Sequence, residues 1–359
     1  MLDTAYQSIY LLVVFVLTLI FARKYTFSVL ANVNRRTTSY TALSFFLAMC
    51  FALFIGFRPI SIAFVDMVSY DEVYSHLLGS HFYFDTEVDN LLYDNWLAYM
   101  ASLSIPVKFF FLSVAVVYFG MIWLACRKLF PNDTIIAFLV YLAAFSTFSY
   151  ATNGIKAGMA SSIFLVALAY YDRPLISIPV ALLTYTIHHS MLLVIVAYFI
   201  TLLFKKPRYY LVIWVVAFVI SALHITYFQY LFAGLTDEHG AEYLLSSAHS
   251  GFRIDFILYS AVPVVVGYLM LTKYKLRSKT YNIILSLYLL TNSVWMLCMY
   301  SSFTNRISYL SWFLYPIVLL YPFLNATWSR RQAAYLKYVI WGHISFTIFM
   351  NVIYYGLLK

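Results

Sequence analysis

The chain has 359 residues, of which 64% are hydrophobic, 20% aromatic and 10% charged, and its mean hydropathy is +0.83. A soluble domain is about half apolar and a quarter charged. The composition therefore excludes a secreted enzyme, a nucleic-acid-binding protein and a disordered scaffold, because none of these could hide so much apolar surface from water. The net charge of +9 is better explained by membrane orientation, as the placement of the charges below indicates.

Apolar runs of spanning or near-spanning length follow one another along the whole chain. A crossing helix needs about 20 apolar residues. Residues 157–204 must hold three short crossings, which is typical of tilted or re-entrant segments. We expect an all-α polytopic integral membrane protein of about 10–12 transmembrane helices, built as a single domain over residues 1–359, for which a GT-C-like arrangement is one candidate. The runs lie at about 7–22, 40–57, 107–126, 134–151, 157–171, 174–188, 189–204, 209–228, 254–272, 281–300, 306–324 and 338–357.

The first apolar run is expected to remain as a membrane span. No basic residue precedes it, and Asp3 stands where the positive region of a cleavable signal peptide would lie. The three cysteines, Cys50, Cys126 and Cys298, lie far apart inside apolar runs and are interpreted as packing residues.

The basic residues indicate which side of the membrane each loop occupies. With an extracytoplasmic N-terminus, all but six of the 23 basic residues become cytoplasmic, as the positive-inside rule favours. All acidic residues except Asp133 and Asp172 then lie outside. The six basic residues on the outer side are Arg58, Lys108, Lys156, Arg253, Arg306 and Lys359. We expect a multi-pass protein of the bacterial cytoplasmic (inner) membrane with an active outer face.

Two outer segments, 58–106 and 229–253, are too long to be simple connectors. The first mixes Leu, Tyr and Trp with carboxylates at helical spacing, which predicts helices on the outer leaflet surface. Loops of this length in a compact protein are usually functional or disordered, and the aromatic content argues against disorder.

Four of the outer cations lie at the ends of separate apolar runs. Snorkelling of long side chains to the headgroups explains any one of them. Their convergence on the outer side instead favours a polyanionic ligand such as a lipid-linked phosphate or pyrophosphate. These four candidate ligands are Arg58, Lys156, Arg253 and Arg306.

Candidate proton acceptors lie on the same side. Asp66 is followed by Tyr70, one helical turn later on the same face if the segment is helical. His188 and His189 form either a polar turn or a proton acceptor, since imidazole titrates near neutral pH. Asp255, two residues after Arg253, is a candidate partner or orienting group for that arginine. The remaining carboxylates of the first outer segment are interpreted as a solvated face: Asp71, Glu72, Asp85, Glu87, Asp89 and Asp94.

Motifs for other chemistries are missing from the sequence. It contains no HExxH or CxxC spacing, so no metal is expected, and no GxSxG, Walker or GxGxxG element. No cofactor is expected.

Four short motifs together resemble the EpsG family of Wzy-type polysaccharide polymerases. They are Gly56-Phe57-Arg58 with Asp66 and Tyr70, then Asn153-Gly154-Ile155-Lys156-Ala157-Gly158-Met159-Ala160, then His188-His189-Ser190, and finally Asn305-Arg306-Ile307-Ser308-Tyr309. Their order covers residues 56–309. The sequence departs from the family at Lys156-Ala157, where the family usually has Arg-Gln. Lysine keeps the charge of arginine but loses its bidentate geometry.

The resemblance implies glycosyl transfer at the outer face of the cytoplasmic membrane. The growing glycan on one polyprenyl pyrophosphate would move to the terminal sugar of a second lipid-linked repeat unit, and a separate flippase and chain-length regulator would be partners. The cations would stabilise the pyrophosphate leaving group, with Asp66, His188 or His189 as general base and Tyr70, Asn153, Asp255 and Asn305 as further substrate contacts. We expect a single inverting, metal-independent displacement.

Two alternatives remain open at this stage. An O-antigen ligase or another polyprenyl-dependent glycosyltransferase would need the same outer cations, and only the acceptor distinguishes it. A flippase for lipid-linked oligosaccharides would carry polar residues along the depth of its spans, whereas the spans here are nearly free of charge.

Overall fold

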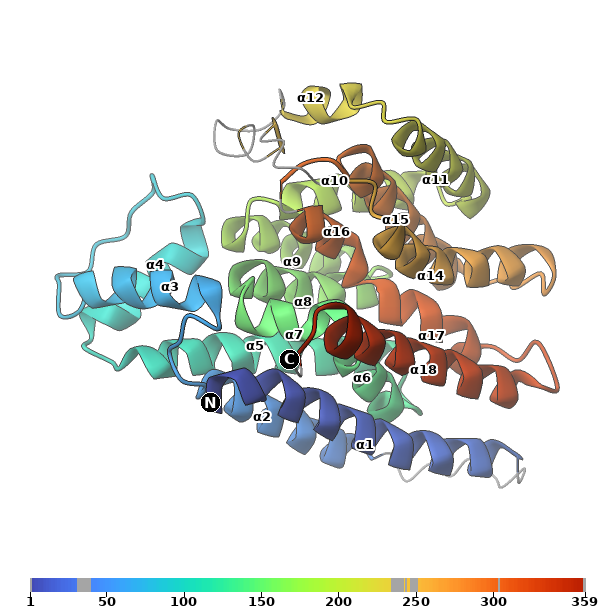
Figure 1. Ribbon diagram of the computed structural model, residues 1–359, viewed down its shortest axis with the longest axis horizontal. Helices are drawn as coiled ribbons and strands as arrows, with labels where there is room; N and C mark the ends of the chain where they lie inside the picture. Colours follow the sequence, from blue (N-terminus) through green and yellow to red (C-terminus); the bar gives the residue numbers. More distant parts are fainter. Residues whose placement is uncertain are drawn as a thin grey trace. The chain divides into compact units, whose positions relative to one another are not determined.

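The computed structural model describes residues 2–30, 40–233, 242, 244–245, 251–302 and 304–357. Within these residues the regular elements are helices and there is no strand. The protein is thus an all-α polytopic membrane protein, as expected from the sequence (Figure 1). Most of the predicted outer segment 229–253 and Lys359 lie outside the described residues.

The chain divides into two compact units, residues 1–191 with 323–359 and residues 192–322. Unit 1 contains α1 (Leu2–Leu30), α2 (Thr41–Gly56), α3 (Val65–His76), α4 (Leu91–Ser102), α5 (Val107–Leu129), α6 (Thr134–Leu142), α7 (Phe145–Thr152), α8 (Ile155–Ala169), α9 (Pro174–Ile187), α18 (Gln332–Ile348) and a π-helical turn (Phe349–Tyr354). Unit 2 contains nearly all of α10 (Met191–Leu203) and α17 (Tyr315–Asn325), and all of α11 (Pro207–Ala222), α12 (Tyr227–Ala233), α14 (Ile254–Thr272), α15 (Lys279–Leu297) and α16 (Thr304–Trp312).

Five helical segments of the described chain are long and apolar enough to cross a membrane, or seven if each of two bent helix pairs forms one span. Four more apolar helices, α2, α8, α9 and α10, are shorter than a full span. The expected ten to twelve crossings are reached only when these shorter helices are counted as well. Helices α8, α9 and α10 correspond to the three short crossings predicted in residues 157–204.

Local chemistry explains several helix boundaries. Pro174 and Pro207 begin α9 and α11, where the missing N–H of proline costs no hydrogen bond. Ser278 caps α15, its hydroxyl accepting from the Tyr281 N–H at 3.2 Å. His224 has a φ of 57° in the turn between α11 and α12, where the chain bends by 108°.

The run predicted as a single span at 134–151 is broken. Helices α6 and α7 meet at an angle of 73°, and α7 ends in a tight turn in which the Ser149 carbonyl accepts from Asn153 N at 2.8 Å and Gly154 N at 3.1 Å. Helix α8 then packs closely on α7, because a Cβ at Gly158 would overlap the Tyr150 carbonyl oxygen. The Asn153–Ala160 motif therefore forms the turn between α7 and α8, at Asn153 and Gly154, and the beginning of α8.

The predicted outer segment 58–106 contains two surface helices, α3 and α4, as expected. Both pack on the beginning of α5, and α4 also packs on α9 (Figure 1). The Tyr74 hydroxyl donates to the Ile105 carbonyl at 2.7 Å, and Gly79 N donates to the Ala101 carbonyl at 2.9 Å. These contacts hold α3 and α4 against the end of the span that follows them.

Unit 2 has a buried polar network around Asn292 on α15. Its amide accepts from Trp214 Nε1 at 2.8 Å and donates to Ser260 Oγ at 3.1 Å and Ser311 Oγ at 2.9 Å. Trp312 Nε1 also donates to Ser260 Oγ at 2.8 Å. Since every polar group in an apolar medium needs a partner, this network fixes how α11, α14, α15 and α16 pack on one another.

Candidate functional site

An ion pair joins the segment 58–106 to the beginning of α8. Lys156 Nζ, on the first turn of α8, lies 2.6 Å from Asp94 Oδ1 on α4. The two side chains keep only 20% and 25% of their exposure. Lys156 Nζ also lies 5.5 Å from the centre of the Tyr70 ring and 5.0 Å from that of Tyr93. The lysine is therefore held between a carboxylate and two aromatic faces, which favour a cation.

Asp94 is in turn oriented by Asn90, at the beginning of α4. Asp94 Oδ2 accepts from Asn90 N at 3.0 Å and Asn90 Nδ2 at 3.4 Å. Asn90 Oδ1 accepts from the backbone N–H of His189 at 3.4 Å. A continuous set of hydrogen bonds thus runs from Lys156 through Asp94 and Asn90 to the turn between α9 and α10.

The histidine pair occupies that turn. His189 stacks on Tyr185, with ring centres 4.9 Å apart. His188 Nδ1 lies 3.2 Å from Ser190 N and 3.0 Å from Ser190 Oγ. Both histidines are half-buried, so their rings combine a local structural role with partial access to solvent.

Arg58 lies immediately after α2 and is 3% exposed. Its Nη1 donates to the Ile55 carbonyl at 2.8 Å, and its Nη2 donates to the Thr152 carbonyl, at the end of α7, at 2.9 Å. Its guanidinium also lies over the rings of Phe64 and Phe111, 5.5 and 5.4 Å from their centres. Among the described residues no carboxylate lies within ion-pair distance of Arg58, and Arg58 Nε has no hydrogen-bond partner.

The charge of Arg58 is therefore buried and not neutralised. Burial lowers the pKa of Arg58 to about 10, so the side chain stays cationic at neutral pH. Buried charges are costly unless they are paired. An arginine in this state provides a strong local field for an anion.

Asp66 lies in the first turn of α3, and Tyr70 follows it one turn later, which confirms the helix that the sequence predicted. The Tyr70 ring lies 5.9 Å from that of Tyr93, on α4. Burial, together with the charges of Asp94 and Asp66, raises the pKa of Tyr93, against the opposing effect of Arg58. Within the part of the chain that the structure describes, the Tyr93 hydroxyl has no hydrogen-bond partner. Tyr93 thus lies where the fields of Arg58, Asp66 and Asp94 overlap.

Unit 1 therefore brings several of the predicted site residues close to one another. Arg58 donates to the residue just before Asn153, and Asn153 caps the turn that leads to Lys156. The buried Asn153 Oδ1 has no hydrogen-bond partner. The predicted residues in this unit are Arg58, Asp66, Tyr70, Asn153, Lys156, His188 and His189.

Unit 2 contains the other predicted residues. Arg253 forms two hydrogen bonds to Asp255, from Nε at 2.9 Å and Nη2 at 2.6 Å, and its guanidinium lies 3.5 Å from the centre of the Phe256 ring. The interpretation of Asp255 as the partner of Arg253 is thus confirmed. Asn305 and Arg306 lie in the first turn of α16, and Arg306 is exposed.

Sequence reasoning missed three residues of this site: Asn90, Tyr93 and Asp94. Asp94 was interpreted as part of a solvated face, which is wrong, because Lys156 and Asn90 both bond to it. The only available signal was the spacing of Asn90 and Asp94 at the beginning of a helix, and that signal does not single out Asp94 from its acidic neighbours. The described residues contain no group of three His, Cys, Asp or Glu that could hold a metal ion.

These features define a class: a polytopic membrane protein with a charged site built from the ends of its helices and a helical surface segment. The chain matches the family model described as the EpsG family over residues 41–358. It therefore belongs to the EpsG family, and this membership indicates a polysaccharide polymerase type of role, associated with glycosyl transfer. No curated protein and no solved structure matches the chain.

Proposed function

We propose that this protein polymerises lipid-linked oligosaccharide repeat units at the outer face of the cytoplasmic membrane. The growing glycan on polyprenyl pyrophosphate would be transferred to the terminal sugar of another lipid-linked repeat unit. The observation that carries the proposal is Arg58, a buried cation whose hydrogen bonds, within the described part of the chain, go to the neutral carbonyls of Ile55 and Thr152. A pyrophosphate leaving group supplies the anion that such a cation lacks.

The chemistry is a single displacement at the anomeric carbon. The acceptor hydroxyl oxygen forms a bond to that carbon while the bond from the carbon to the pyrophosphate oxygen breaks, and the electron pair leaves with polyprenyl pyrophosphate. The hydroxyl proton passes to a base, for which Asp66, His188 and His189 are the candidates. Cations near the bridging oxygen lower the barrier because negative charge develops there.

The candidate pyrophosphate ligands differ in how much of their charge is available. Lys156 and Arg253 each pair with a carboxylate, whereas no carboxylate described in the structure pairs with Arg58. Arg306 lies exposed at the beginning of α16. In unit 1 we assign Arg58 as the principal anion ligand, Lys156 as a supporting cation, and Tyr70 and Asn153 as groups that orient the substrate. In unit 2 we assign Arg306 and Arg253 as anion ligands and Asp255 and Asn305 as groups that orient the substrate.

The size profile of lipid-linked glycans tests the proposal. Cells that lack the gene are complemented with the wild type, with Arg306→Ala or with Arg23→Ala, which removes another exposed arginine. We expect single repeat units to accumulate without the gene and with Arg306→Ala, and polymer to return with the wild type and with Arg23→Ala. Full-length polymer that stays on its lipid carrier would instead identify a ligase, and equal loss in both variants would refute a role for Arg306 in the site.

The stereochemistry of the product tests the mechanism separately. A single displacement inverts the anomeric configuration, so the new linkage should have the configuration opposite to that of the lipid-linked donor. Retention would rule out the single displacement while leaving polymerisation itself intact.

A further inference from the structure

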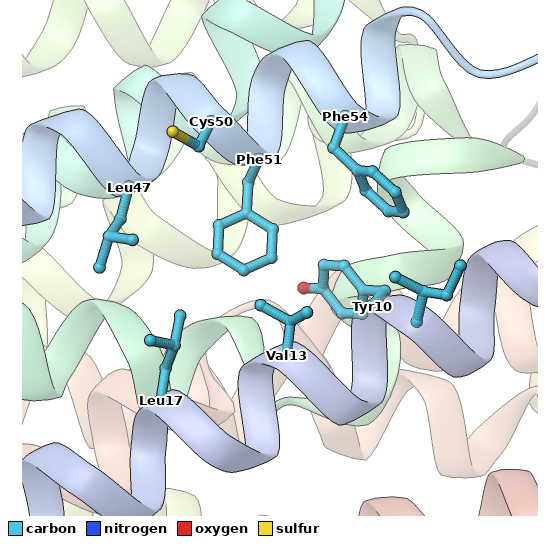
Figure 2. Close-up of a pocket in the computed structure, with 8 residues that line it drawn as sticks. Tyr10, Val13, Leu17, Leu47, Cys50, Phe51 and Phe54 are labelled. Atoms are coloured by element: carbon cyan, nitrogen blue, oxygen red, sulfur yellow. The ribbon is translucent and has the colours of Figure 1, made fainter.

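An apolar groove separates α1 from α2 in unit 1. Its volume is about 190 Å³. Figure 2 shows side chains of the two helices facing each other across the open space, with Val13 and Leu17 on one side and Leu47 and Phe51 on the other. The lining is completed by Ile9, Tyr10, Cys50 and Phe54.

The groove offers almost no hydrogen-bonding group. The hydroxyl of Tyr10 donates to the Leu142 carbonyl at 2.8 Å, so the tyrosine presents its ring to the groove rather than an unsatisfied polar atom. The other lining residues are aliphatic or aromatic, apart from the Cys50 thiol. An occupant of matching chemistry is a hydrocarbon chain, since a polar ligand would lose its hydrogen bonds with water and gain none.

The groove is bounded by aromatic pairs at both ends and is open along its side. Tyr6 stacks on Phe54 with ring centres 4.7 Å apart, and Phe21 packs against Tyr40 at 5.8 Å. Val13, in the lining, is 41% exposed. In a membrane protein such an apolar rim faces lipid, so a chain can enter from the bilayer.

One end of the groove adjoins the buried cation. The Tyr6 ring, which stacks on Phe54 of the lining, also lies 5.9 Å from the ring of Phe64. The Arg58 guanidinium lies over that same Phe64 ring, 5.5 Å from its centre. A hydrocarbon chain in the groove would therefore have its anionic end beside the cation that no described carboxylate neutralises.

We propose that the groove between α1 and α2 binds the polyprenyl chain of a lipid-linked substrate whose pyrophosphate lies at Arg58. The proposal rests on the proposed function and adds a place for the lipid. It is supported by the apolar lining, by the opening towards the bilayer and by the charge of Arg58 at one end. Helix α1 lies outside the residues that match the EpsG family model. The family match therefore says nothing about the α1 side of the groove.

Photocrosslinking of the full-length protein in lipid nanodiscs tests the proposal. The probe is geranylgeranyl pyrophosphate with a diazirine on its terminal isoprene unit, and the labelled peptides are identified by mass spectrometry. We expect labels on α1 and α2 at the groove. Leu47→Trp should lower this labelling about tenfold, a change equivalent to about 1.4 kcal/mol, because the larger ring fills the space that Leu47 borders.

The chain offers a matched control one residue away. Phe46 is 63% exposed and lies outside the groove lining, so Phe46→Trp should leave the labelling unchanged. Val13→Trp repeats the test from the α1 side in case Leu47→Trp does not fold, and size-exclusion chromatography in detergent reports on folding of each variant.

Two further probes separate the candidate occupants. Equal labelling by the corresponding diazirine alcohol, which lacks the pyrophosphate, would overturn the link to Arg58. Displacement of the probe by phosphatidylglycerol as effectively as by unlabelled geranylgeranyl pyrophosphate would identify an ordinary phospholipid site and overturn the proposal, as would labels confined to other helices. None of these measurements requires turnover, so groove labelling without any glycan phenotype would refute the polymerase while leaving the lipid site standing.

Discussion

Replacement of Arg58 by methionine separates a catalytic role for this residue from a structural one. Methionine has a long, flexible and uncharged side chain that fits between Phe64 and Phe111, where the guanidinium now lies. The variant removes the buried charge and the two hydrogen bonds to the Ile55 and Thr152 carbonyls. It leaves most of the packing in place.

The structure indicates how far stability should change. Burial lowers the pKa of Arg58 to about 10, and one pKa unit corresponds to about 1.4 kcal/mol, so keeping the cation costs the folded state about 3 kcal/mol. The two hydrogen bonds from a charged donor return about 1.5–3 kcal/mol each. Replacement of Arg58 therefore loses about 3–6 kcal/mol of hydrogen bonding and recovers about 3 kcal/mol, so the free energy of unfolding should fall by no more than about 3 kcal/mol.

Activity should respond far more strongly than stability. Removal of one group that stabilises developing negative charge lowers the rate by about 100- to 1,000-fold in other enzymes. We expect Arg58→Met to reach near wild-type levels in the membrane, with a melting temperature within a few degrees of the wild type, while cells accumulate single lipid-linked repeat units. The assays are the thermal stability of the purified protein in detergent and the size profile of lipid-linked glycans.

The pH dependence adds a second check. Because the folded-state pKa is the lower one, both the folded and the unfolded chain bind this proton below about pH 10, and the full cost of burial is present there. That cost is relieved only as the pH rises above about 10, towards the ordinary pKa of arginine. Arg58 should therefore add no pH dependence to activity between pH 7 and 9. Polymer formation by Arg58→Met, or loss of the folded protein, would refute the assignment of this residue as an anion ligand.

The other predictions concern the residues around this cation. Asp94→Asn should lower the free energy of unfolding by about 1 kcal/mol, because the ion pair with Lys156 is partly exposed. A double-mutant cycle with Lys156→Met, measured by thermal unfolding, should show coupling between the two residues. Additive effects would mean that the ion pair does not hold α4 in place. Gly158→Ala should destabilise the protein by about 2 kcal/mol or more, because the added Cβ would overlap the Tyr150 carbonyl oxygen. Gly120→Ala is the control, because open space surrounds Gly120. In the same melting assay it should be neutral or stabilising by up to about 1 kcal/mol. Tyr93→Phe should leave the melting temperature unchanged or raise it, because its hydroxyl has no partner, and a loss of polymer without loss of protein would assign that hydroxyl to the substrate.

Hydropathy predicted the positions of most helices well, since lipid requires long apolar runs. The runs 157–171 and 174–188 correspond to α8 and α9, and Pro174 marks the boundary between them. The break between α6 and α7 was not predicted. No proline or glycine lies in residues 134–151, and apolarity reports burial but not the direction of the chain. The 73° bend instead involves contacts such as the Thr147 hydroxyl, which donates to the Tyr141 carbonyl at 2.7 Å.

The candidate site was predictable as residue types but not as a set of contacts. Arg58 stood out because a charge at the end of an apolar run is unusual, and Asp66 because it lies eight residues beyond Arg58 and is followed by Tyr70 one helical turn later. Asp94 did not, because it is one of several carboxylates in the same segment, and its distinguishing partner, Lys156, lies 62 residues further along the chain. The groove between α1 and α2 has no motif at all, since its lining residues look like any other apolar positions.

The contacts of Lys156 also account for the one departure from the family motif. An arginine is favoured where a planar group must bind two oxygens at once. Lys156 instead makes one short bond to Asp94 Oδ1 and lies over two tyrosine rings, and a compact ammonium ion suits this arrangement.

Because Asp94 neutralises its charge, Lys156 contributes a weaker electrostatic field at the site than Arg58 does. Its main effect is to hold α4, with Tyr93 on it, against the turn between α7 and α8, which is the same turn whose Thr152 carbonyl orients Arg58. In this scheme the lysine positions the site and the buried arginine supplies its charge.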